Sequence, residues 1–292
     1  MTIATLSQVL RPCLSDGTAV AGLVVLGWED ASAYVAAAEA EGRPVILQAG
    51  PGCRAHTPLS VLGAMFRALA ETASVPVVAH LDHGESMAVC RAAIDCGFTS
   101  IMYDGSALAL QENIVRTAEI VAMAHGLGIS VEAELGYVGY HAGAPSADTV
   151  PAEVARFQIE TGVDALAVSI GNTHLMKTSR ATINLALLAA IQQAAPDLPL
   201  VLHGGSGIAM AERASLAQST ICKFNIGTEM RQTFGTALRQ VLAEDPRRFD
   251  RIEILSATMP AVEWAARRAI RSLCGAERIF GTNEVRDGSP EH

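Results

Sequence analysis

The chain has 292 residues, of which 50% are hydrophobic and only 17% are charged. That composition excludes a disordered polypeptide and indicates a large buried core. The formal net charge is −9, from 30 acidic and 21 basic residues, which argues against a nucleic-acid partner but allows a local pocket for a small anion. Six cysteines without a CxxC pair are typical of reduced thiols inside the cell. With no signal-peptide pattern and no apolar run of bilayer length, we expect a soluble, cytoplasmic protein without a membrane partner.

Eight short apolar runs alternate along the chain with helical patterns. Each run is near-continuously apolar, as expected for strands that are covered on both faces. The predicted strands are Val20–Leu26, Pro44–Gln48, Val75–Leu81, Thr99–Tyr103, Ile129–Leu135, Ala165–Ile170, Leu198–Leu202 and Ile221–Ile226.

Helix signals occupy the segments between these strands. Thr57 and Pro58 are typical of an N-cap followed by proline at the first helical position, so we expect a helix to begin there. Another expected helix starts at Pro151, has Glu153 in its first turn and ends before Gly162. Strands that alternate with helices predict right-handed crossovers and a parallel sheet.

Eight such units in a chain of this length fit a closed (β/α)8 barrel, or TIM barrel. An open, doubly wound sheet is the alternative on periodicity alone. We expect residues 1–292 to form a single domain whose tail, from about residue 246, is a helical extension with a frayed end. The irregular segment 137–148 directly follows a strand, a position typical of an active-site lid.

Histidines stand at the ends of three predicted strands. His83 ends the third run, and His174 and His203 follow the sixth and the seventh. Barrel enzymes carry their chemistry at the C-terminal strand ends, so the three side chains are expected on one rim. One such histidine alone is more often a hydrogen-bonded structural residue. Three neutral imidazoles with a fourth position left open are the usual arrangement for catalytic zinc.

A glycine-rich segment, Gly204-Gly-Ser-Gly207, follows the seventh predicted strand. Its backbone N–H groups could approach an anion closely, and this part of a barrel is the usual phosphate site. Thr228 stands at the end of the eighth strand, and Lys177 could supply a countercharge.

Several carboxylates are expected near the same rim. Asp82 precedes His83 and could either orient a metal ligand or act as a general acid/base. Glu132 and Glu134 share one face of the fifth strand, and Asp104 ends the fourth. Each of these acids could also serve only to balance the charge of a cation.

In order and spacing, a series of segments resembles the class II, metal-dependent fructose- and tagatose-bisphosphate aldolases. The resemblance runs roughly from Ala31 to Arg231 and implies their TIM-barrel fold. The matching segments are Pro44-Val-Ile-Leu-Gln48, His80-Leu-Asp-His-Gly84, Gly97-Phe-Thr-Ser-Ile-Met-Tyr-Asp-Gly-Ser106, Val131-Glu-Ala-Glu-Leu-Gly136, His203-Gly-Gly-Ser-Gly207 and Lys223-Phe-Asn-Ile-Gly-Thr-Glu229.

The resemblance implies a role for each matching residue. His83, His174 and His203 match the ligands of one Zn2+ per chain, while Asp104 and Glu134 match carboxylates around that metal. Asp82 matches the acid/base that handles the C4 hydroxyl proton when the C3–C4 bond is broken or re-formed. A divalent cation would act as the electron sink in that reaction.

The remaining matches concern the substrate. Gly204, Gly205, Ser206 and Thr228, with Lys177 nearby, match the site for the phosphate of dihydroxyacetone phosphate, and Asn225 matches a contact to the enediolate. Arg231 matches a residue that reaches a second phosphate, and backbone groups near Gly171 and Gly204 match a Na+ or K+ site. The resemblance also implies a small sugar phosphate as substrate and a homodimer or homotetramer.

The chain departs from the family where the aldehyde half of the substrate would lie. The usual Phe-Asn-x-x-Asn pattern is replaced by Val25-Leu-Gly-Trp-Glu-Asp30, and the segment 49–56 lacks the serine of the distal phosphate. The lid segment 139–144 lacks the glutamate that is a candidate for the C3 proton transfer. Gly227 stands where fructose-specific members often have Asp.

These departures predict a tagatose-type or other non-fructose substrate, because a site without polar partners for particular hydroxyls discriminates weakly among them. Candidates to line the altered pocket are Trp28, Arg54, His56 and His141. Two other functions stay open at this point: a hydrolase in which zinc activates water, and a non-catalytic relative, suggested by the missing lid glutamate.

Overall fold

A computed structural model describes residues 2–139, 146–174 and 181–274. The strands in this part of the chain are β1 (Ile3–Ala4), β2 (Val20–Val24), β3 (Val45–Ala49), β4 (Val77–Gly84), β5 (Ser100–Tyr103), β6 (Ser130–Leu135), β7 (Ala165–Val168), β8 (Leu200–Leu202) and β9 (Ile221–Ile226). The helices are α1 (Leu6–Asp16), α2 (Trp28–Glu41), α3 (Pro51–His56), α4 (Leu59–Thr72), α5 (Met87–Asp95), α6 (Leu110–His125), α7 (Pro151–Thr161), α8 (Leu185–Ala194), α9 (Met210–Leu216), α10 (Thr228–Glu244), α11 (Arg251–Ser256) and α12 (Met259–Arg271), with a 3-10 turn η1 (Gly205–Gly207).

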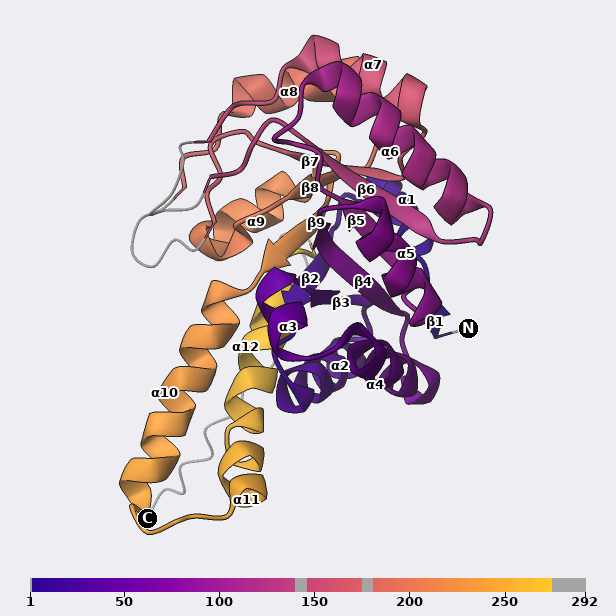
Figure 1. The fold of residues 1–292 in the computed structure, drawn as a ribbon. Helices are drawn as coiled ribbons and strands as arrows, with labels where there is room; N and C mark the ends of the chain where they lie inside the picture. Colours follow the sequence, from indigo (N-terminus) through magenta and orange to yellow (C-terminus); the bar gives the residue numbers. More distant parts are fainter. Residues whose placement is uncertain (1, 140–145, 175–180, 275–292) are drawn as a thin grey trace, which may run out of the picture.

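The strands β2 to β9 close into a parallel barrel. Each pairs with its neighbours in chain order, and β9 pairs with β2, so that no edge is left open. Helices surround this barrel on the outside, as Figure 1 shows. The expected (β/α)8 barrel is confirmed, and the doubly wound alternative is wrong.

The N-terminal end of the barrel is closed by α1. Leu6, Val9, Leu10 and Cys13 recur at helical spacing and pack on residues at the lower ends of the strands, such as Val20. A capping box formed by Thr5 and Gln8 starts this helix. The buried apolar face of α1 therefore forms a floor at the N-terminal end of the barrel. This end lies opposite to the rim that the C-terminal ends of the strands form.

The barrel interior above this floor is polar. Gln48, His80, Ser100, Glu132 and Lys223 are all fully buried, and Gln48 and Ser100 flank His80 in the registers of β3, β4 and β5. Residues on a strand alternate between the inside and the outside of a barrel. The polar positions are thus the inward ones, and the apolar residues between them pack against the helices.

Local differences from the sequence expectations are few. The helix expected from Pro58 begins at Leu59, with Pro58 as its N-cap, and Thr57 instead ends the unpredicted helix α3. The helix from Pro151 ends at Thr161, and Gly162 caps it in the left-handed conformation, as expected. β1 and α1 were not predicted either, because β1 is two residues long and α1 contains Pro12.

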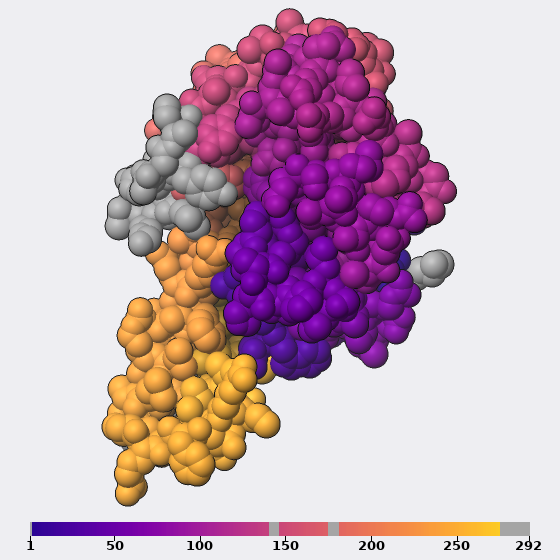
Figure 2. Space-filling view, viewed as in Figure 1, coloured from indigo at the N-terminus to yellow at the C-terminus, as the bar shows by residue number. Residues whose placement is uncertain are grey.

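After the last barrel strand come α10, which ends at Glu244, and then α11 and α12, which lie in the segment beyond residue 246. In Figure 2 these C-terminal helices, in orange and yellow, project from the rounded body of the barrel. α12 returns to pack against α2. In the described part of the chain, no helix combines the length and apolarity needed to cross a membrane.

Candidate active site

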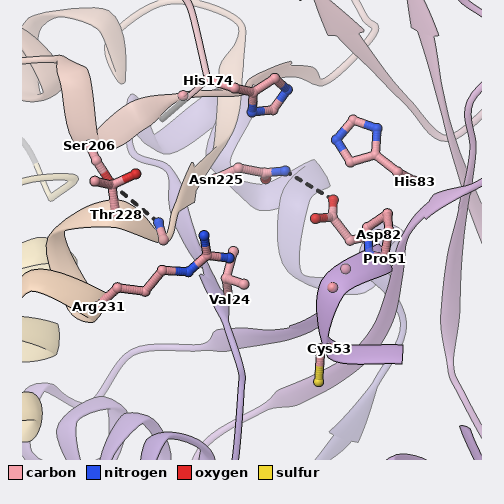
Figure 3. A pocket seen from close by; sticks show the side chains of 14 residues that line it. Val24, Pro51, Cys53, Asp82, His83, His174, Ser206, Asn225, Thr228 and Arg231 are labelled. Atoms are coloured by element: carbon pink, nitrogen blue, oxygen red, sulfur yellow. Dashed lines mark hydrogen bonds between the residues drawn. The ribbon is translucent and has the colours of Figure 1, made fainter. Parts of the chain in front are cut away.

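A pocket of about 250 Å³ opens at the C-terminal ends of the barrel strands. Figure 3 shows His83 and His174 on one side of this pocket and Ser206 and Thr228 on the other, with Asn225 between them. Most of the residues that the sequence singled out therefore meet in one place. The lining residues are Val24, Gly50, Pro51, Gly52, Cys53, Asp82, His83, His174, Gly204, Ser206, Asn225, Gly227, Thr228 and Arg231.

The three strand-end histidines face one another at the base of this pocket. The ring centroids of His83 and His203 are 4.8 Å apart, and the ring of His174 lies 5.4 Å from each of them. One ring nitrogen from each histidine lies within 4.8 Å of the other two. His203 is fully buried.

The backbone at Asp82 and His83 explains how two consecutive side chains reach the same pocket. In a regular strand they would point to opposite faces. The pairing of β4 with β5 shifts register between Leu81 and Gly84, and His83 has a φ of 50°. It is the only non-glycine residue with positive φ in the described chain, a conformation that costs roughly 1–3 kcal/mol. Such strain persists only where the surroundings fix the backbone.

Asp104 orients the ring of His83. The His83 Nδ1–H group donates to Asp104 Oδ2 at 2.7 Å, while Ser106 donates to the other carboxylate oxygen from its N–H and its hydroxyl. Burial alone would lower the pKa of His83, but the negative Asp82 and the bond to Asp104 raise it to about 9. The hydrogen bond on Nδ1 leaves Nε2 as the nitrogen that can bind a cation.

His203 is fixed from the opposite side by a buried network. Its Nε2 lies 3.2 Å from Glu132 Oε1, and the other oxygen of Glu132 accepts from Lys223 Nζ at 2.6 Å. Lys223 Nζ also lies 3.2 Å from His80 Nε2, and His80 Nδ1 lies 2.8 Å from Ser100 Oγ. Burial and the adjacent Lys223 lower the pKa of His80 to about 3, so His80 is neutral and can accept from the ammonium. The sequence reasoning missed Lys223 and His80.

Within the described part of the chain, Nδ1 of His203 and Oε2 of Glu134 are buried without a hydrogen-bond partner. They lie 3.5 Å apart. Burial raises the pKa of Glu134, while burial and the neighbouring histidine rings lower the pKa of His174 to about 3. A buried imidazole nitrogen and a buried carboxylate oxygen at this separation, next to two further histidine rings, fit a divalent cation, which would satisfy both atoms together. His83, Asp104 and Glu134 form a second possible group of ligands.

Asp82 lies beside this cluster, and Asn225 holds it. The Asn225 amide donates to Asp82 Oδ1 at 3.2 Å, and both side chains are only 6% exposed. Burial would raise the pKa of Asp82, but His83 and His203 outweigh it and lower that pKa. The group is therefore an ionised carboxylate at the pocket wall, which can accept a proton from a bound hydroxyl.

The opposite wall is built from the glycine-rich turn and the start of α10. Gly204 has a φ of 69°, and a Cβ at this position would lie 2.3 Å from the carbonyl oxygen of Thr173, so only glycine fits. The Ser206 hydroxyl accepts from the N–H groups of Gly227 and Glu229, each at 3.2 Å. The turn is thereby fixed against the N-terminus of a helix of 17 residues, a position that favours anions.

The other predicted residues have different placements. Gly205 is the buried first residue of the turn η1, and Gly171 has a φ of 98°. Arg231 lines both the main pocket and an adjoining pocket of about 480 Å³, which Trp28 and His56 also line. Lys177 and His141 lie outside the described residues.

Arg54 departs from the expectation for the aldehyde pocket. Arg54 is not among the described residues that line the main pocket or the adjoining one. Its guanidinium instead donates to the carbonyl oxygens of Ala49, Asp82 and His83. The sequence could not show this orientation, because an arginine five residues beyond the end of a strand can turn to the backbone or to the solvent.

A closed barrel with acid/base, histidine and anion-binding groups gathered at its C-terminal rim defines a TIM-barrel enzyme. The family model described as "Fructose-bisphosphate aldolase class-II" matches residues 4–278. The chain belongs to this family and is a class II aldolase, hence a lyase. The family is generally metal-dependent. The resemblance noted in the sequence is confirmed, and the hydrolase alternative is set aside.

Similar proteins span nearly the whole chain. A fructose-bisphosphate aldolase of Geobacillus stearothermophilus is 33% identical over 97% of this chain and 98% of its own. A 6-phospho-5-dehydro-2-deoxy-D-gluconate aldolase of Shouchella clausii is 33% identical over the same shares. Among solved structures, the YdjI aldolase of Escherichia coli K12 matches with a TM-score of 0.82 and 33% identity, covering 93% of this chain and 97% of that one.

Proposed function

We propose that the chain is a zinc-dependent aldolase that reversibly cleaves a ketose 1-phosphate or ketose 1,6-bisphosphate into dihydroxyacetone phosphate and an aldehyde. The observation that carries this proposal is the juxtaposition of three facing histidine rings and the Asp82 carboxylate with an anion-binding helix terminus in one pocket. A metal, an acid/base and a phosphate site are the three parts that this reaction needs.

In this proposal His83, His174 and His203 hold one divalent ion, with Asp104 and Glu134 as adjacent carboxylates. The unpartnered His203 Nδ1 supports this ligand set. The ion would supply the Lewis acidity that draws electrons toward the ketone half of the substrate. Glu132 and Asp104 keep the histidines oriented, since each accepts a hydrogen bond from the ring nitrogen that faces away from the cluster.

Asp82 takes the proton from the C4 hydroxyl of the ketose. The C3–C4 bond then breaks, C4 becomes the carbonyl carbon of the aldehyde, and the electron pair of the bond passes to the ketone half. A proton delivered to C3 completes dihydroxyacetone phosphate. Asn225 supports this role because its amide fixes the Asp82 carboxylate at the pocket wall.

The phosphate of the ketone half binds to the glycine-rich turn and the N-terminus of α10. Gly204, Gly205, Ser206 and Thr228 contribute here, with Lys177 as a countercharge. Binding energy at the phosphate, remote from the breaking bond, orients the reacting carbons. Arg231 stands three residues beyond Thr228 and also lines the adjoining pocket, so a second phosphate could reach it.

We infer a tagatose-type or other non-fructose substrate from the contact between Gly227 and Val24. A Cβ at position 227 would lie 3.0 Å from Val24 Cγ2. An aspartate at this position, as fructose-specific members often have, would require Val24 to move. The absence of that acid removes one polar partner of the substrate hydroxyls.

The test is a coupled assay for dihydroxyacetone phosphate with tagatose 1,6-bisphosphate, fructose 1,6-bisphosphate and their 1-phosphates. If fructose 1,6-bisphosphate is the best substrate by about tenfold, the specificity inference is wrong and the aldolase proposal stands. Release from none of them contradicts the aldolase proposal. Elemental analysis should find one zinc per chain and none in His203→Ala. A matched control is His125→Ala. His125 is the last residue of the outer helix α6, pairs with Asp164 and does not line the pocket.

We further propose a cytoplasmic homodimer or homotetramer. Exposed apolar side chains on the C-terminal helices and the loop before α11 support self-association: Phe249 is 92% exposed and Ile252 is 77% exposed. Sedimentation of the wild type and of Phe249→Ser would test this. A Na+ or K+ ion near the backbone of Gly171 and Gly204 stays a prediction, to be tested by the dependence of activity on either ion.

A further inference from the structure

Arg54 contacts the backbone of the candidate catalytic segment at three points. Its Nη1 donates to the carbonyl oxygens of Ala49 at 2.8 Å and Asp82 at 2.5 Å, and its Nη2 donates to the carbonyl oxygen of His83 at 2.9 Å. Ala49 ends β3, whereas Asp82 and His83 lie near the end of β4. The guanidinium therefore joins the ends of two neighbouring strands.

The segment that it joins is the irregular part of β4. His83 is in the left-handed region, and the register with β5 shifts around Asp82 and His83. The registers of β4 with β3 and with β5 give no partner residue for Asp82 or His83, and the guanidinium supplies a donor to the carbonyl group of each. A planar guanidinium with several donors at fixed angles is suited to hold carbonyls that point in different directions.

The surroundings of Arg54 favour this structural task over contact with substrate. Its side chain is 10% exposed, and Arg54 is not among the residues that line the main pocket or the adjoining one. The nearest carboxylate, Glu85, lies 3.7 Å from Nη2 and is 73% exposed, so it is a weak partner. α3 places Arg54 here because it starts at Pro51, directly beyond β3.

We propose that Arg54 is a positioning residue for the aldol reaction, holding the Asp82–His83 backbone so that both side chains point into the pocket. This inference rests on the proposed roles of Asp82 and His83. Arg54 does not touch the reacting atoms. It acts through the acid/base and through one ring of the histidine cluster, and its loss affects both together.

The test compares Arg54→Ala and Arg54→Lys at saturating metal with the substrate that the panel identifies. We expect kcat to fall on the order of 100-fold in the alanine variant, with KM changed less than about threefold, because a small misplacement of a reacting group costs rate more than binding. The lysine variant keeps the charge but cannot bond three carbonyls, so its kcat should fall by at least about tenfold.

Two readouts separate positioning from a general loss of structure. Millimolar guanidinium should restore part of the kcat of Arg54→Ala, whereas equal urea should not. Independently of activity, the affinity for Co2+ should weaken about tenfold, as for other groups that orient metal ligands, and the visible spectrum of the Co2+ protein should change. These spectra would still test the positioning of His83 if the wild type cleaved no ketose phosphate.

Matched controls are Glu85→Gln, which removes only the weak ion pair, and Arg91→Ala, which removes an exposed arginine that pairs with Asp95 on α5. Both should retain wild-type kcat within about twofold. The inference is overturned if Arg54→Lys keeps full kcat and Co2+ affinity, or if Glu85→Gln loses as much as Arg54→Ala. A loss in Arg54→Ala that guanidinium does not restore, together with an unchanged Co2+ spectrum, would also overturn it.

Discussion

Lys223 is fully buried at the centre of the barrel, where an ammonium without partners would be costly. Its partners are Glu132 and His80. The segment 221–226 is mostly apolar, and its strand was predicted correctly. The pairing of its lysine inside the barrel was not predicted. The signal was available: Lys223 and Asn225 stand two residues apart, as do Glu132 and Glu134, and such polar alternation indicates a polar barrel interior.

Lys223→Met should destabilise the protein by about 3–5 kcal/mol, because it leaves the Glu132 carboxylate buried and without its cation. Urea unfolding, followed by circular dichroism, measures this change. The double variant Lys223→Met/Glu132→Gln should recover part of the loss, since the uncompensated charge is then gone. A single-variant loss below about 1 kcal/mol would mean that the buried pair contributes no more than a surface ion pair.

Asp82→Ala should fold and bind metal but cleave its substrate about two orders of magnitude more slowly, or worse, the usual scale for a positioned acid/base. Exchange of the C3 proton of dihydroxyacetone phosphate with solvent should survive better, if Asp82 serves only the C4 oxygen. Steady-state cleavage and proton exchange measured by NMR give the two rates. Equal losses would assign Asp82 to the C3 proton as well, or to support of the metal. Asp95→Ala on the outside of α5 is the control.

The convergence of His83, His174 and His203 could be predicted because each stands at the end of a strand, and parallel strands in a barrel end on one rim. What the sequence could not provide is orientation. Whether Arg54 faces a pocket or a carbonyl depends on the path of α3 and on the irregular end of β4. Both are consequences of packing between segments that lie far apart in the chain.

At the scale of elements, Glu41 joins the end of α2 to α12. Its carboxylate accepts from Arg267 and Arg271, with the nearest atoms 2.7 Å and 2.6 Å apart. Partial burial would raise the pKa of Glu41, but the two arginines outweigh it and lower that pKa below 4.5. This pair of bonds helps to hold the returning helix of the C-terminal extension against the barrel.

Glu41→Gln should cost roughly 1 kcal/mol of unfolding free energy at pH 7, the upper range for a partly exposed ion pair. The folded-state pKa of Glu41 is the lower one, so its contribution is complete above the unfolded value of 4.5 and declines as the pH falls toward the folded value. The difference between variant and wild type should therefore shrink below that pH. Urea titrations of the metal-free proteins at several pH values measure it, and a difference independent of pH would exclude the ion pair as its cause.

Element prediction succeeded where a segment carries its own pattern. The eight barrel strands are continuous apolar runs, and the helix from Pro151 to Thr161 is bounded by proline and glycine. β1 and α3 are too short for any periodicity. β1 is held by its pairing with the lower part of β4, where Ile3 pairs with Val77. α1 has apolar residues at helical spacing, but its proline weakened the signal.

For the whole molecule, a bound metal should stabilise the fold, because the three histidines proposed as its ligands come from three different strand ends. Zinc at 100 times its dissociation constant would add about 2.7 kcal/mol, which corresponds to a rise in Tm on the order of 5 °C for a chain of this size. Differential scanning calorimetry of chelator-treated protein with and without zinc measures the shift. His203→Ala should show little of it, and an equal shift in that variant would place the stabilising metal elsewhere.

The pocket opens at the C-terminal rim, and beneath it the barrel is filled by the buried side chains of His80, Glu132 and Lys223 and then covered by α1. In the proposed reaction, the substrate, the ion, water and both products therefore all pass this rim. The products must leave by the same end of the barrel at which the next substrate enters. A molecule that covers the rim would therefore trap whatever the pocket already contains, and its inhibition would depend on whether it arrived before or after the substrate. This dependence of inhibition on the order of binding would follow from the position of the pocket opening and not from the chemistry at the base of the pocket.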